Sequence, residues 1–173
     1  DDVFFITTTN ATYTARAVIL AFGLTPRPMN VPGEAALQGK GVCYCATCDA
    51  PLYKGKRVAV VGGTFEALDA ALLLSRLECT VHFVHDKESV TTHPELFDQL
   101  QNDPRVTMHM QTIVVRVVGS ERVEGLMVRD ASANEQTLDV DGIFVEKGYR
   151  IDATWLGDLV ELDARHAIVV NEE

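Results

Sequence analysis

The stretch RVAVVGGTFEALDAALLLSRLECTVHFVH, residues 57–85, decides the fold. It opens with a short apolar run of the kind found in strands that are buried on both faces, and two glycines follow directly. Residues 66–77 are apolar on nearly every side, which predicts a buried helix, and residues 80–85 form a second strand-like run. The order strand, tight turn, helix, strand predicts one βαβ unit with a right-handed crossover.

Strand-like runs also lie on both sides of this unit. Residues 3–9 and 13–21 are β-rich and flank Asn10-Ala11, which predicts a hairpin, and residues 93–101 predict a short helix. Four further β runs predict a β-meander inserted after the second parallel strand, at residues 106–110, 113–118, 123–129 and 138–145. The expected fold class is α/β: a Rossmann-like, three-layer nucleotide-binding domain with an inserted β-meander.

The composition is that of a folded globular chain. Of 173 residues, 47% are hydrophobic and 23% are charged, which excludes disordered and collagen-like classes. No apolar run approaches the roughly 18 residues needed to cross a bilayer. Acidic residues outnumber basic ones by 25 to 15, for a net charge of −10, so the surface repels phosphate backbones and anionic membranes. We therefore expect neither nucleic acid nor a membrane as partner.

Three of the four cysteines, Cys43, Cys45 and Cys48, lie within six positions, and Cys79 lies apart. The spacing of Cys45 and Cys48 is C-x-x-C, which lets the two sulfurs close a small, reversible disulfide ring. Asp49 follows directly and can donate or accept a thiol proton. The pair therefore predicts redox catalysis. Such a pair is typical of a reducing compartment, and no secretory leader is visible, so a cytoplasmic location is expected.

Two less specific readings of the cysteines stay open. One is a structural zinc site that uses Cys43, Cys45 and Cys48, and the other is a set of inert, buried thiols. Zinc needs a fourth ligand, and the sequence has no matching second C-x-x-C or H-x-x-x-H. No metal is therefore expected.

The glycine turn after the first strand of the βαβ unit resembles a dinucleotide-binding turn. In such a turn the second motif glycine lets the backbone approach the pyrophosphate. Thr64 stands at that position, and Glu66 adds negative charge near the start of the helix, so nucleotide affinity is expected to be weak. The alternative is a βαβ scaffold whose pyrophosphate site has decayed.

The end of the second strand carries the residues that would meet the ribose. Asp86 suits a ribose 2′-hydroxyl, and Lys87 is the one cation available for a 2′-phosphate, so NADPH is disfavoured. The candidate cofactor-binding residues are Gly62, Gly63, Thr64, Phe65, Glu66, Asp86, Lys87 and Gly148.

The chain resembles the low-molecular-weight thioredoxin reductases and related disulfide reductases over nearly its whole length. The resemblance is carried by AVILAFG at residues 17–23, VPGE at 31–34, CATCD at 45–49, and the runs at 54–63 and 144–150. It implies that residues 1–27 are part of a flavin-binding domain. Residues 28–150 would be a nicotinamide-binding-like domain carrying the C-x-x-C, and residues 151–173 a return segment to the flavin domain.

The resemblance also implies a route for the electrons. Reduced FAD, whose site would lie mostly outside this segment, would reduce the disulfide through Cys48. Cys45 would attack the disulfide of a thioredoxin-like protein, with Asp49 as proton donor. Members of the family are usually homodimers.

This sequence departs from the family at the nucleotide site, where Thr64 replaces a glycine and His85-Asp86-Lys87 replaces a His-Arg-Arg cluster. In these features it resembles variants that take electrons from ferredoxin or from a second flavin. One alternative function is an NADH-linked peroxiredoxin-reductase-type enzyme, which Asp86 suggests. Another is a non-catalytic module that binds a nucleotide or a metal.

Overall fold

The structure is a computed structural model that describes residues 3–91, 93–151, 154–163 and 167–170. The chain divides into two compact units. One unit comprises Asp1–Leu24 and Ile151–Glu173, and the other comprises Thr25–Arg150. All the candidate redox and nucleotide-binding residues lie in the second unit. That residues 1–27 and 151–173 belong to a flavin-binding domain stays a prediction.

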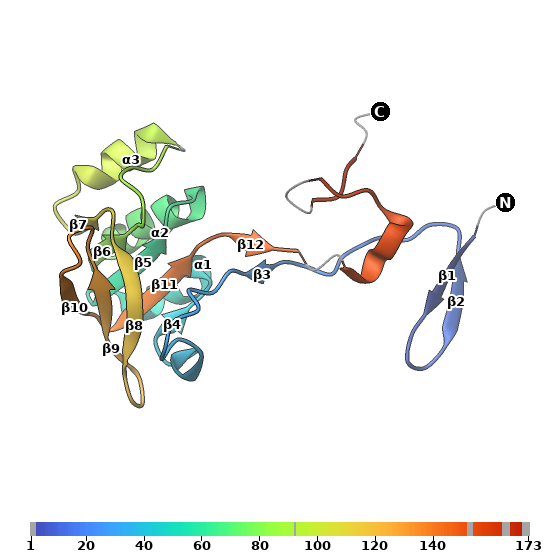
Figure 1. Ribbon diagram of the computed structural model, residues 1–173, viewed down its shortest axis with the longest axis horizontal. Helices are drawn as coiled ribbons and strands as arrows, with labels where there is room; N and C mark the ends of the chain where they lie inside the picture. The colour runs from blue at the N-terminus through green and yellow to red at the C-terminus, as the bar shows by residue number, and fades with distance from the viewer. Residues whose placement is uncertain (1–2, 92, 152–153, 164–166, 171–173) are drawn as a thin grey trace. The chain divides into compact units, whose positions relative to one another are not determined.

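The second unit is built around a five-stranded parallel sheet with the strand order β4-β11-β5-β6-β7 (Figure 1). The strands are β4 (Val42–Cys43), β5 (Arg57–Gly62), β6 (Thr80–Val84), β7 (Val106–His109) and β11 (Gly142–Glu146). Helix α2 (Phe65–Arg76) connects β5 to β6, which pair in parallel. The predicted βαβ unit is therefore confirmed.

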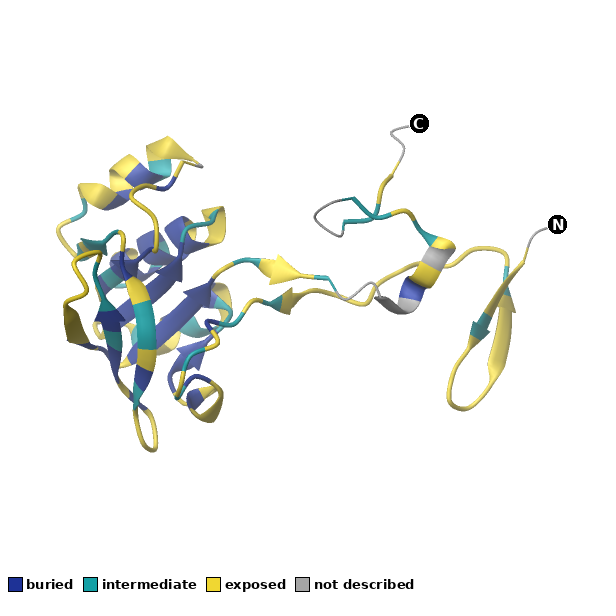
Figure 2. Ribbon diagram, viewed as in Figure 1, coloured by how far each residue is buried: buried dark blue, intermediate teal, exposed yellow. Residues whose placement is uncertain are grey.

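The two faces of the sheet are buried by different layers because side chains alternate along each strand. Val58 and Val60 pack with α2 and with α3 (Pro94–Gln101) in one apolar cluster. Ala59 and Val61 belong to a second cluster, on the opposite face. Figure 2 shows the buried residues concentrated in this central sheet. A strand covered on both faces reads as a continuous apolar run, as the sequence of β5 does.

The second face of the sheet is covered by an antiparallel meander. Its strands are β8 (Ile113–Gly119), β9 (Val123–Arg129) and β10 (Glu135–Asp139), in the order β10-β9-β8. Val117, Leu126 and Val128 of this meander join Ala59 and Ile143 of the parallel sheet in the second cluster. The helices, the parallel sheet and the meander therefore form three layers, with the predicted meander as one of the outer two.

Two details of the predicted meander are wrong. Residues 106–110 do not belong to it, because β7 pairs in parallel with β6 at the edge of the main sheet. The run at 138–145 is not one strand but two, β10 and β11, and β11 returns to the centre of the parallel sheet. Asp141 lies between the two strands and is bound to the start of β5: its side chain accepts the N–H of Arg57 at 3.1 Å, and its own N–H donates to the Arg57 carbonyl at 2.8 Å.

Prolines and glycines are frequent at residues 24–41, which predicts a linker. The structure instead fixes this segment to the second unit from Thr25 onward. Strand β3 (Thr25–Pro26) pairs with β12 (Tyr149–Arg150), and a short 3-10 helix, η1, spans Ala35–Leu37. The buried carboxylate of Glu34 accepts the N–H groups of Met29 and Asn30, both at 2.7 Å. Prolines and glycines interrupt regular secondary structure in this segment, but hydrogen bonds hold its backbone in place.

The first unit contains the predicted hairpin, formed by β1 (Phe4–Thr7) and β2 (Thr12–Ala15), together with the 3-10 helix η3 (Thr154–Leu159). The second strand ends at Ala15, so its predicted extension to residue 21 is wrong. In the part of the chain that the structure describes, no strand pairs with residues 16–21, and Ile19 there is 92% exposed. Among the described residues, no helix is long and apolar enough to pass through a lipid bilayer.

Candidate redox site and nucleotide cleft

The C-x-x-C pair lies where β4 runs into the short helix α1 (Ala46–Asp49), and the structure joins Cys45 and Cys48 in a disulfide. Cys45 has an extended backbone and precedes the helix, and its Sγ accepts the N–H of Cys48 at 3.3 Å. The hydroxyl of Thr47 lies 3.4 Å from the same sulfur. Cys48 is exposed and Cys45 is half-buried, so the disulfide is open to a reductant or a protein partner.

The other two cysteines are buried and free. Burial raises the pKa of the Cys43 thiol to about 11, and its sulfur contacts the Tyr53 hydroxyl at 3.7 Å. Burial likewise raises the pKa of Cys79, which donates to the Tyr53 carbonyl at 3.0 Å. Both thiols stay protonated at neutral pH, and a protonated thiol is a poor nucleophile.

The structure favours the redox reading over zinc for the C-x-x-C pair, because both of its sulfurs are used in the disulfide. Among the described residues, no three His, Cys, Asp or Glu side chains gather as a metal site would require. Asp49 ends α1, and its carboxylate adds to the raised pKa values of Cys43 and Tyr53. Its role as proton donor to the disulfide stays a prediction.

A cavity of about 110 Å³ opens beside the disulfide. Two of the predicted nucleotide-binding residues, Phe65 and Glu66, line this cavity. The remaining lining residues are Cys45, Ala46, Thr47, Asp69, Ala70, Glu146 and Tyr149. The first turn of α2 is therefore part of the surroundings of the disulfide.

The glycine turn has the tight packing that its sequence predicts. A Cβ atom on Gly62 would collide with the Glu146 carbonyl, and one on Gly63 would collide with the His85 ring. Thr64 caps α2: its hydroxyl accepts the N–H of Ala67 at 3.4 Å and donates to the Glu146 carbonyl at 3.3 Å. The hydroxyl thus holds the turn to β11.

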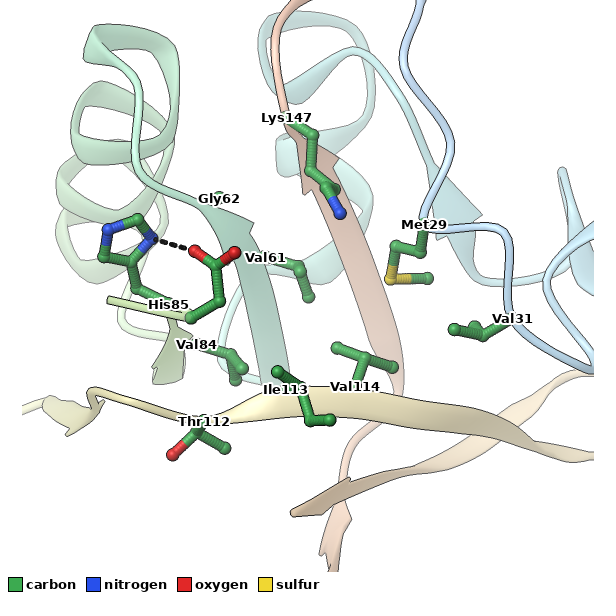
Figure 3. A pocket seen from close by; sticks show the side chains of 11 residues that line it. Met29, Val31, Val61, Gly62, Val84, His85, Thr112, Ile113, Val114 and Lys147 are labelled. Atoms are coloured by element: carbon green, nitrogen blue, oxygen red, sulfur yellow. Dashed lines mark ion pairs between the residues drawn. The ribbon is translucent and has the colours of Figure 1, made fainter. Parts of the chain in front are cut away.

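A second pocket, the glycine pocket, has a volume of about 120 Å³. It lies at the carboxyl ends of β5 and β6, where nucleotides bind in folds of this kind (Figure 3). It brings Gly62 and Asp86 together, and Lys147 also lines it, whereas Phe65 and Glu66 do not. That these residues bind a nucleotide stays a prediction. Lys87 and Gly148 are not among its lining residues. Burial lowers the pKa of His85, which lies 3.4 Å from the Asp86 carboxylate, so its ring is neutral at pH 7.

A family model described as "Pyridine nucleotide-disulphide oxidoreductase" matches residues 2–173. The chain belongs to this family. It is 35% identical over 174 residues to the thioredoxin reductase of Treponema pallidum (strain Nichols), an alignment that covers 100% of this chain and 56% of that protein. It is 39% identical over 163 residues to the F component of the alkyl hydroperoxide reductase of Pseudomonas putida, covering 93% of this chain and 31% of that protein.

Solved structures of the family show the same fold. The thioredoxin reductase of T. acidophilum matches with a TM-score of 0.85 and 31% identity, over 97% of this chain and 56% of that one. A ferredoxin-flavin thioredoxin reductase from Clostridium acetobutylicum matches with a TM-score of 0.55 and 34% identity, over 98% and 54%. These relatives confirm the predicted resemblance to thioredoxin reductases. The chain spans about half the length of the matched thioredoxin reductases.

The sequence did not point to two residues that line these cavities, Glu146 and Lys147. Glu146 is 5% exposed beside the disulfide cavity, and Lys147 supplies a cation to the glycine pocket. The signal in the sequence was an acidic residue at the end of the otherwise apolar run at 142–146. Buried acids are rare unless they have a specific role or partner.

Replacing Thr64 by alanine is expected to lower the free energy of unfolding around α2 by about 1 kcal/mol, because the first turn loses its side-chain cap. Amide hydrogen exchange of the first turn of α2 measures this loss in the intact protein. Thr64→Ser keeps the hydroxyl and should retain most of the protection. Equal protection in the alanine and serine variants would show that the cap contributes little.

Proposed function

We propose that this chain is part of a flavin-dependent disulfide oxidoreductase of the thioredoxin-reductase type. In this proposal the Cys45–Cys48 disulfide receives an electron pair and passes it to the disulfide of a thioredoxin-like protein. The observation that carries the proposal is the accessible disulfide itself, held at the start of α1 in a chain of this family. An exposed Cys48 beside a half-buried Cys45 suits two different reaction partners, one for each sulfur.

The electron donor to the disulfide is proposed to be FAD, held by a domain to which residues 1–27 and 151–173 contribute. The exposed side chains of Val18, Ile19 and Leu20 support this, because apolar runs of this kind are normally covered in a folded domain. A bound flavin supplies the electron pair that opens the disulfide. Cys48 is proposed to face the flavin, Cys45 to attack the partner, and Asp49 to carry the proton of Cys48.

The source of the electrons is proposed to be ferredoxin rather than NADPH. Among the described residues that line the glycine pocket, Asp86 is the one carboxylate, and its charge disfavours a 2′-phosphate. Lys147 is the one cation of this lining, and the neutral His85 adds no positive charge. Thr64 fills the position of the second motif glycine. The similarity to the ferredoxin-flavin enzyme of Clostridium acetobutylicum supports the same donor.

The proposal is tested on the intact, flavin-loaded protein by mixing it in turn with reduced ferredoxin, NADPH and NADH. Flavin absorbance and the alkylation of Cys45 and Cys48 are followed together. Reduced ferredoxin should bleach the flavin and release both thiols at once, whereas NADPH at micromolar concentration should do neither. Rapid bleaching by NADPH would refute the choice of donor. Failure of every reductant to release the two thiols would refute the disulfide reductase function.

An NADH-linked peroxiredoxin-type reductase is a second candidate. Asp86 lines the nucleotide pocket, where its carboxylate suits the ribose 2′-hydroxyl of NADH. The F component of the alkyl hydroperoxide reductase of Pseudomonas putida is 39% identical to the chain. Bleaching by NADH alone in the same experiment would select this candidate. A non-catalytic nucleotide-binding module would show no thiol release with any donor.

The cellular location and the oligomeric state of the protein are also proposals. A reversible C-x-x-C disulfide functions in a compartment that keeps thiols reduced, which supports a cytoplasmic location. Assembly as a homodimer is proposed from the family resemblance, and sedimentation of the intact protein tests it.

A further inference from the structure

Glu146 is a buried carboxyl group beside the disulfide that the proposed electron route does not use. It is the last residue of β11, and the alternation along the strand turns it to the same face as Phe144, toward the helices. Its Oε1 accepts the N–H of Ala46 at 3.3 Å. That amide directly follows Cys45, so the hydrogen bond fixes the carboxyl next to the backbone of the reactive cysteine.

Glu146 and Cys45 also line the same cavity of about 110 Å³. One water molecule occupies roughly 30 Å³ in the liquid, so the cavity has room for water that relays a proton between the sulfur and the carboxyl. The other titratable residues that line the cavity are Glu66 and Asp69 of α2, both exposed, and Tyr149 of β12. Among the residues that the structure describes, no cationic side chain lines it.

The surroundings of Glu146 keep its proton exchangeable near neutral pH. Burial is the main cause that raises its pKa, to about 7, and the nearby Glu66 charge raises it further, while the Ala46 N–H lowers it. Asp49 of α1 instead contributes to the raised pKa values of Cys43 and Tyr53. A carboxyl that titrates close to the working pH can both take up and return a proton efficiently.

We propose that Glu146 is the acid–base group of Cys45, exchanging the thiol proton through the shared cavity; this rests on the proposed disulfide reductase function. In the dithiol form, Cys45 gives its proton to the Glu146 carboxylate. The Cys45 thiolate attacks one sulfur of the partner disulfide and forms a mixed disulfide. The other partner sulfur leaves as a thiolate and takes the proton from Glu146.

The second half of the exchange uses the other cysteine. Cys48, whose proton passes to Asp49, attacks the Cys45 sulfur and re-forms the Cys45–Cys48 bond. The second partner sulfur leaves as a thiolate and takes up that proton. Two electrons and two protons have then moved from the dithiol to the partner, so the Glu146 proton is one of the two that the products carry.

The test is Glu146→Gln in the intact protein, because glutamine keeps an oxygen that accepts the Ala46 N–H but does not titrate. The pre-reduced protein is mixed with a thioredoxin disulfide, and the single-turnover rate of reoxidation is measured from about pH 5.5 to 9. In the wild type this rate should rise through pH 7. In the variant that rise should disappear, and the rate at pH 8 should fall by roughly tenfold or more.

Asp69→Asn is the matched control, because it removes an exposed carboxylate from the same cavity. It should keep the rise through pH 7 and a rate within about twofold of the wild type. The Glu146→Gln variant is expected to fold. The raised pKa of Glu146 means that the folded protein binds more protons than the unfolded one, so stability falls as pH rises to about 7. A glutamine side chain does not titrate, so the variant does not lose stability in this way.

A uniform loss of rate at every pH, with the profile unchanged in shape, would show a merely structural role and overturn the proposal. So would a variant rate equal to that of the wild type. A second measurement needs neither this variant nor turnover: infrared titration of the Glu146 carboxyl in the dithiol protein and in Cys45→Ser. Coupled groups shift each other's pKa reciprocally. Identical titrations would overturn the assignment, even if thioredoxin proved not to be the partner.

Discussion

Replacing Cys45 by serine is expected to abolish reduction of a protein disulfide, with a loss of roughly a thousandfold or more. A serine hydroxyl does not form the thiolate that attacks a disulfide, and Cys48 alone has no neighbouring sulfur with which to release a trapped partner. The measurement is the rate at which the intact, pre-reduced protein reduces a thioredoxin disulfide. Flavin content and absorbance should stay unchanged, since the substitution lies in the disulfide and not in the proposed flavin-binding domain.

Cys48→Ser separates the roles of the two sulfurs. It should also lose turnover, but it should retain a stable mixed disulfide between Cys45 and the partner, visible on a non-reducing gel. Cys79→Ala is the matched control, because this thiol is buried away from the pair and should leave turnover intact. The proposed assignment would be reversed if the Cys45→Ser variant formed a mixed disulfide through Cys48 while the Cys48→Ser variant formed none through Cys45.

The central βαβ unit could be predicted from the sequence because its signals are local. The apolar run of β5, the glycine pair and the apolar helix each decide their own structure within a few residues. The partners of β7 and β11 could not be predicted in the same way. Edge parallel strands and meander strands have similar β-rich sequences, and only long-range pairing assigns residues 106–109 to the parallel sheet.

The disulfide of the candidate site could be predicted from the sequence, but the way its neighbouring residues group around the cavities could not. The C-x-x-C spacing predicted the disulfide that the structure shows, and Gly62 and Asp86 do meet in one pocket. Phe65 and Glu66 lie instead beside the disulfide, because α1 and the first turn of α2 face the same cavity. The burial of Glu146 depends on the register of β11 against β5, which the sequence alone does not contain.

Replacing Phe144 by alanine is expected to lower the free energy of unfolding of the second unit by about 3–5 kcal/mol. Phe144 is completely buried on β11, and its ring meets that of Tyr53 edge-on, with centroids 5.3 Å apart. Truncation removes a large apolar side chain and leaves a cavity between the sheet and α2. Since domains are stable by only about 5–15 kcal/mol, much of the margin would be lost. Amide hydrogen exchange in β5 and β11 of the intact protein measures the change.

Phe65→Ala is the matched control, because it removes the same side chain from a position that is 45% exposed. Its ring contacts that of His93 at 4.9 Å but leaves no buried space when removed, so the expected loss is below about 1 kcal/mol. If both variants lost the same protection in β5 and β11, packing of Phe144 would not be what stabilises the centre of the sheet. A large difference would show that the buried side chains of β11 stabilise the sheet. Glu146 is the last residue of this strand. The burial of β11 that holds the sheet together therefore also keeps the Glu146 carboxyl out of water.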